Sequence, residues 1–149
     1  GVPPSTPGEG GVKQTAKASV LISVSGDTIA VVDAKGRLVR TYGALGMGKG
    51  VYLGSTGTIR EKKVDADYII SPDLARLNPL MPSAVPGGHP LNPLGKYSVK
   101  AEGDIYLASP RAEGRGWITE NSGFVLLKED DARDLYRRVR VNDVVRFVE

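Results

Sequence analysis

Apolar and polar residues alternate along the chain from residue 19 onward. Every second position of residues 19–25 is apolar, and a Gly-Asp turn then leads into a second apolar run at residues 28–32. An Asp-Ala-Lys-Gly turn follows and leads into residues 38–42. Alternation with a period of two, interrupted by turn residues, is typical of antiparallel strands joined by hairpins. The pattern predicts a three-stranded meander at the start of the domain.

The rest of the chain combines short apolar segments with two long loops. Residues 43–65 hold seven glycines or serines and end in a basic stretch, so they are predicted to be a loop. Residues 72–95 hold six of the ten prolines and are predicted to form a long loop with one short turn near residues 73–77. A loop this long in a small domain is either a binding loop or plain decoration. Strands are predicted at residues 68–70, 96–99, 104–108, 116–119, 123–127 and 144–148.

One helix is expected at about residues 130–140. Apolar residues stand at positions 132, 135, 136 and 139, with acidic residues in the first turn and basic residues in the last. Arg133, Arg137 and Arg140 follow one another at helical spacing and are candidates for docking an anionic protein partner, although such faces are usually only solvated. The fold class is therefore mainly β (α+β), with one substantial helix.

Composition removes several kinds of chemistry. The 149 residues contain no cysteine and one histidine, which excludes thiol catalysis and disulfides and argues against a metal site; no cofactor is expected. The net charge of +3 is too small to favour a nucleic-acid partner. No apolar run approaches the length of a membrane span. Residues 1–17, rich in Gly, Pro and polar residues, read as a flexible tether before one domain at residues 18–149.

The last third of the chain resembles the L,D-transpeptidase (YkuD-like) family. Residues 123–147 run from a Gly through an acidic helix start into Asp-Ala-Arg-Asp-Leu-Tyr and a last strand, in step with the end of that family's catalytic domain. Residues 92–95, Asn-Pro-Leu-Gly, and the opening meander are similar to the family as well. The resemblance implies a YkuD-like β-sandwich or barrel of short strands and a place in the bacterial cell envelope, in the periplasm or the cell wall.

The resemblance also locates the family's catalytic positions, and their chemistry is absent. The upstream His corresponds to Tyr106, and the fourteen residues from 107 to 120 match the family's spacing before its nucleophile motif. Within that motif the Ser or Thr corresponds to Asn121, the second His to Ser122, the nucleophilic Cys to Phe124 and the Arg to Leu126, and only Gly123 is retained. A phenyl ring is no nucleophile, and a tyrosine is a poor base at neutral pH. The degenerate motif predicts a pseudoenzyme.

Three functions remain open at this stage. The first is binding of a peptidoglycan stem peptide, or of another peptide, in the inherited groove, with Tyr106, Trp117, Ser122, Phe124 and His89 as candidate ligand-binding residues. The second is docking of an envelope protein on the basic helix face or on the Pro-rich loop. The third is residual or novel transferase or hydrolase activity. His89 is more readily explained as an exposed loop residue, and Trp117 as a core residue.

Overall fold

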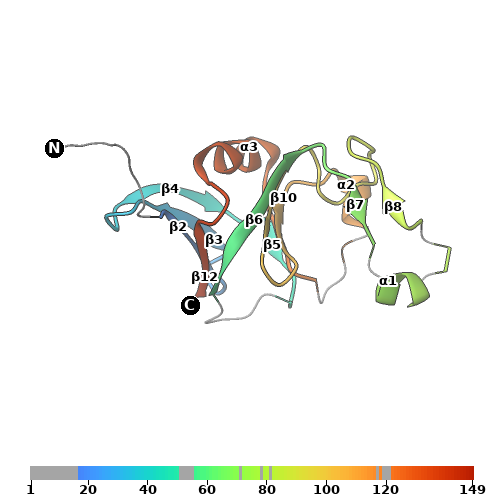
Figure 1. Cartoon of the computed structure of the whole chain (residues 1–149), viewed down its shortest axis with the longest axis horizontal. Coiled ribbons are helices and arrows are strands. Elements are labelled where there is room, and N and C mark those ends of the chain that lie inside the picture. Colours follow the sequence, from blue (N-terminus) through green and yellow to red (C-terminus); the bar gives the residue numbers. More distant parts are fainter. Residues whose placement is uncertain are drawn as a thin grey trace.

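The computed structural model describes residues 17–50, 56–70, 72–77, 79–80, 82–116, 118 and 122–149. These residues form one curled nine-stranded sheet, a separate two-stranded sheet and short helices (Figure 1). The mainly β architecture predicted from the sequence is confirmed. No helix in these ranges is long and apolar enough to cross a membrane.

The opening meander is confirmed. Strands β2 (Ser19–Ser23), β3 (Thr28–Val32) and β4 (Leu38–Gly43) pair in sequence order, each antiparallel to the one before. The closing strand β12 (Val144–Val148) pairs in parallel with β2. Alternate residues of β2 and β3 are buried, as expected for strands with one face on a core.

The second half of the sheet is built around β6 (Thr56–Val64), its longest strand. This strand pairs with β12 through residues 56–58 and with β9 (Tyr97–Ala101) through residues 59–64, with an irregularity between Ile59 and Glu61. Strand β9 is followed by β10 (Ile105–Ala108), β11 (Phe124–Leu126) and β5 (Gly46–Met47). Strand β10 runs antiparallel to β9 and parallel to β11, so the sheet continues without a break into the strand that holds Phe124.

Helix α3 (Glu129–Arg138) covers one face of this sheet (Figure 1). Its buried residues Ala132 and Leu135 pack in the main core together with residues from most of the strands. Arg138 forms an i,i+4 ion pair with Asp134, whose carboxylate also accepts a hydrogen bond from Tyr42 of β4. The helix is therefore held by its apolar stripe and by one polar contact with the meander.

The predicted Pro-rich loop carries more structure than the sequence suggested. It contains α1 (Pro72–Leu77) and β8 (Ala84–Val85), and β8 pairs with β7 (Tyr68–Ile69) as a small second sheet. Helix α1 occupies the position of the expected short turn. In Figure 1 these elements lie at the end of the molecule opposite the meander.

Three sequence predictions are wrong. The predicted loop at residues 43–65 contains β5 and β6. Strand β6 was missed because many of its side chains are polar, whereas the strand is stabilised by backbone hydrogen bonds to neighbours on both sides. The predicted strand at residues 116–119 is not present where the structure describes it, because Gly116 follows the short helix α2 (Ala112–Arg115) and Ile118 is in no strand. Arg140 is not on the predicted helix face, because α3 ends at Arg138 and Val139 is extended.

Candidate functional site

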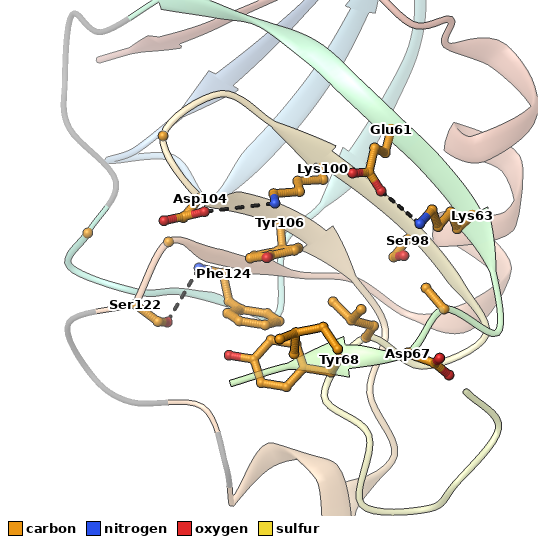
Figure 2. A pocket seen from close by; sticks show the side chains of 16 residues that line it. Glu61, Lys63, Asp67, Tyr68, Ser98, Lys100, Asp104, Tyr106, Ser122 and Phe124 are labelled. Atoms are coloured by element: carbon orange, nitrogen blue, oxygen red, sulfur yellow. Dashed lines mark hydrogen bonds and ion pairs between the residues drawn. The ribbon is translucent and has the colours of Figure 1, made fainter. Parts of the chain in front are cut away.

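A cleft of about 690 Å³ lies on the face of β6, β9, β10 and β11 that is turned away from α3 (Figure 2). The two faces follow from the alternation of side chains along the strands. Val99 and Leu107 pack in the main core with α3, whereas Tyr106 and Phe124 belong to a second cluster on the opposite face. The residues lining the cleft are Gly50, Glu61, Lys63, Ala66, Asp67, Tyr68, Ile69, Leu94, Ser98, Lys100, Gly103, Asp104, Tyr106, Ser122, Gly123 and Phe124.

One row of side chains crosses the cleft from strand to strand. Glu61 on β6 is the register partner of Lys100 on β9, Lys100 is the partner of Tyr106 on β10, and Tyr106 is the partner of Phe124 on β11. The two positions that the resemblance assigns to the family's upstream His and its Cys are thus direct neighbours.

Three aromatic rings form what we call the aromatic floor: Tyr68, Tyr106 and Phe124. The rings of Tyr106 and Phe124 are stacked, with centroids 5.0 Å apart. Tyr68, from the small second sheet, meets both rings edge-on, at 6.2 Å from Tyr106 and 6.1 Å from Phe124. As a result Phe124 is only 3% exposed. The position that the resemblance assigns to the nucleophile is therefore covered, while the cleft above it stays open.

Burial raises the pKa of the Tyr68 phenol, and the nearby Tyr106 and Asp104 raise it further. Tyr68 is consequently protonated at neutral pH and presents a hydroxyl group that can donate a hydrogen bond. It is not a base.

The charged side chains of the cleft differ in how firmly they are paired. Glu61 and Lys63 form an ion pair at 3.0 Å. Lys100 and Asp104 are 3.9 Å apart, and the Asp104 side chain is 87% exposed, so water weakens this pair. The Lys100 ammonium also lies 5.5 Å from the centre of the Tyr106 ring. On the other wall, one oxygen of Asp67 accepts a hydrogen bond from the Gly87 amide.

Gly48 and Gly50 hold β11 and the residues just before it in place. The amides of Gly48 and Gly50 donate to the carbonyl oxygens of Phe124 and Ser122, at 2.8 and 2.9 Å. A Cβ atom on Gly48 would lie 2.0 Å from the Ser122 carbonyl oxygen. At this position glycine is needed for close backbone approach.

Asn92 organises the wall formed by the Pro-rich loop, and its role was missed from the sequence. The buried side-chain amide donates to the carbonyl oxygens of Ala66, Val85 and Pro86, and its oxygen accepts the Leu94 amide. These bonds tie Asn92 to the end of β8 and to the segment just before β7, next to Tyr68. The Asn-Pro-Leu-Gly segment was the available signal, but nothing in it showed what the Asn side chain would contact.

Not all of the predicted site residues meet in the cleft. His89 is exposed in its loop, does not line the cleft, and accepts the Leu91 amide on its Nδ1. Ser122 lines the cleft, and its hydroxyl lies 3.4 Å from the Phe124 amide. Trp117 and Asn121 lie outside the described residues. Among the described residues no group of His, Asp and Glu is arranged to hold a metal ion.

The remaining candidates lie elsewhere. Leu126 is half-buried beside the aromatic floor, on the same face of the sheet as Phe124. Arg133 and Arg137 are exposed on α3, which covers the other face. Ligand binding in the cleft and docking on the helix would therefore use separate surfaces.

Comparisons with known proteins find structural but not sequence similarity. No family model matches the sequence, and no curated protein has a similar one. An L,D-transpeptidase from Mycobacterium smegmatis is similar in structure, with a TM-score of 0.63 and 19% identity over 93% of this chain and 61% of that one. L,D-transpeptidase 1 of Mycobacterium tuberculosis gives 0.57 and 19% identity over 94% and 65%. An L,D-transpeptidase from Stackebrandtia nassauensis gives 0.59 and 16% over 91% and 57%. This chain thus spans less than two thirds of the length of these proteins, and it has the L,D-transpeptidase, or YkuD-like, fold.

Proposed function

We propose that this domain binds a peptide in its cleft, a stem peptide of peptidoglycan in the first place, and does not catalyse peptide transfer. The observation that carries the proposal is the aromatic floor. Where the resemblance expects an imidazole and a thiol, Tyr106 and Phe124 stack against each other at the bottom of an open cleft. Stacked rings supply an apolar contact surface and neither a nucleophile nor a base.

The surroundings of the floor support binding over turnover. Ser122 supplies a serine hydroxyl within the motif, but activation of a serine requires an adjacent base, and the single histidine does not line the cleft. The cleft walls carry charged groups of both signs, among them Asp67, Lys63 and Lys100. A stem peptide carries carboxylates and an amino group, so its charges can be matched there. A peptidoglycan ligand would place the domain in the periplasm or the cell wall.

The proposal is tested by cosedimentation with purified sacculi and by incubation with a tetrapeptide-bearing muropeptide. We expect the protein to sediment with sacculi and the muropeptide to remain unchanged by mass spectrometry. Tyr106→Ala removes one of the three rings of the floor and should abolish sedimentation. Tyr97→Ala is the matched control, because Tyr97 is a half-buried tyrosine on the neighbouring strand that packs on the opposite face against Tyr136.

Other outcomes would favour the alternative functions. No retention on sacculi, together with a protein partner lost on mutation of the exposed Arg133 and Arg137, would indicate a docking domain. Turnover of the muropeptide that Ser122→Ala abolishes would show that the domain is an enzyme.

A further inference from the structure

Of the two lysines that line the cleft, Lys100 is the one directed at the aromatic floor (Figure 2). Its register partners are Glu61 on one side and Tyr106 on the other. The Glu61 carboxylate is engaged by Lys63 at 3.0 Å, which leaves Asp104 at 3.9 Å as the counter-ion that the structure gives Lys100. Because Asp104 is almost wholly in solvent, a ligand carboxylate can replace or join it at low cost.

The position of Lys100 is defined by packing. Its side chain is 35% exposed, and its ammonium lies 5.5 Å from the Tyr106 ring centre. Contact between a cation and a ring face holds the ammonium at the cleft wall and removes part of its water shell. A charge that is already positioned and partly desolvated binds a carboxylate with a smaller loss of entropy than a mobile surface lysine does.

The distance between the cation and the floor constrains the ligand. A carboxylate paired with the Lys100 ammonium lies beside the aromatic floor, because that ammonium is 5.5 Å from the centre of the Tyr106 ring. A residue whose α-carboxylate pairs with Lys100 can thus lay its own side chain on the aromatic floor. If a side-chain carboxylate paired with Lys100, the apolar side chain on the aromatic floor would have to come from a neighbouring residue of the peptide.

We propose that the cleft is a receptor for the C-terminal residue of a peptide, with the α-carboxylate ion-paired to Lys100 and an apolar side chain on the aromatic floor. This inference rests on the proposed peptide-binding function and specifies which end of the peptide is held. Of the other acids of the cleft, Glu61 is paired with Lys63 at 3.0 Å, and Asp67 accepts the Gly87 amide on the other wall.

The test uses three probes: N-acetyl-alanyl-alanyl-leucine as the free acid, the same peptide as its C-terminal amide, and N-acetyl-alanyl-alanyl-glycine as the free acid. Binding is followed by chemical shifts of the backbone amides. We expect the leucine acid to bind about tenfold more tightly than its amide, as a charge-assisted hydrogen bond would give, and more tightly than the glycine peptide. Shifts should centre on β9 and β10.

Lys100→Met keeps the aliphatic stem and removes the charge. It should weaken the leucine acid about tenfold, leave the amide unchanged, and thereby abolish the difference between the two. Lys96→Met is the matched control, because Lys96 also lies near a tyrosine ring, at 5.8 Å from the centre of Tyr97, and does not line the cleft. This control should retain the preference for the acid.

Equal affinity of the acid and the amide in the unaltered protein would overturn the inference, as would a loss in Lys100→Met that is the same for both. Should no probe bind while sacculi still retain the protein, the inference fails and the proposed function stands. Should neither probes nor sacculi bind, both fail.

Discussion

Replacing Asn92 by alanine should destabilise the Pro-rich loop that forms one wall of the cleft. The side chain is 1% exposed, and its amide lies 2.8, 3.0 and 3.2 Å from the carbonyl oxygens of Ala66, Pro86 and Val85. Its oxygen accepts the Leu94 amide at 2.8 Å. An amide group has two hydrogens, so three carbonyls share two donors. At least two donated bonds and one accepted bond are lost, and the burial of the site limits their replacement by bonds to water.

Each lost bond costs about 1 kcal/mol, and each buried group left without a partner adds to that, so Asn92→Ala should lower the free energy of unfolding by about 3–4 kcal/mol. In a domain of this size each kcal/mol corresponds to roughly 2–4 °C, which places the expected fall in Tm near 10 °C. Urea unfolding and thermal melting followed by circular dichroism measure both quantities. Hydrogen exchange at the amide of Leu94 should rise more than exchange in the meander.

Two further variants test the reasoning behind this number. His89→Ala changes an exposed side chain in the same loop and should alter stability by less than about 0.5 kcal/mol. Asn92→Asp places a carboxylate oxygen against the three carbonyls, which raises the pKa of the new acid in the folded state. Its stability should therefore increase as the pH falls, because protonation restores a donor. A loss below about 1 kcal/mol in Asn92→Ala would refute the assignment of Asn92 as the organiser of this wall.

Three other outcomes are expected. Phe124→Cys supplies a thiol but no base on the adjacent strand, so mass spectrometry should detect no muropeptide transfer; measurable transfer would show that the site is less degenerate than proposed. The hydrogen bond from Tyr42 holds the pKa of Asp134 below its usual value, so the stabilisation is present above about pH 4 and is lost as the pH falls through the folded-state pKa. Tyr42→Phe should cost about 1 kcal/mol in urea unfolding at pH 7 and less at pH 3, and an equal cost at both would contradict this. Gly36 and Gly95 both have positive φ, but only at Gly95 would a Cβ atom meet backbone, at 2.0 Å. Gly36→Ala should cost about 1 kcal/mol and Gly95→Ala about 3 kcal/mol or more in the same assay, and equal costs would contradict the steric argument.

Local pattern was sufficient for the elements whose side chains face a core. The meander and α3 were predicted close to their true bounds, because their buried positions recur with periods of two and of three to four residues. The identities of Tyr106 and Phe124 are properties of the sequence, and the resemblance assigned them to the positions of the family's upstream His and its Cys; that they are register partners is shown by the structure.

Strand β6 is an element that the local pattern of apolar and polar residues did not predict. Its side chains divide between the cleft, where Glu61 and Lys63 are polar, and the main core, where Ile59 is buried, so no apolar alternation marks it. It is a strand because β9 and β12 supply backbone partners on both sides. Such partners come from segments far away in the chain and leave no trace in the residues of the strand itself.

The sequence by itself determined the class of fold, the position of the helix and the absence of a thiol. Only the tertiary structure decided that Tyr68 covers Phe124, that the Lys100 ammonium lies over the Tyr106 ring, and that Asn92 joins three separate segments. The physical reason is the distance along the chain over which each kind of interaction acts. Periodicity and turn chemistry act over a few residues, whereas a cleft is formed by side chains that strand register brings together from distant parts of the chain.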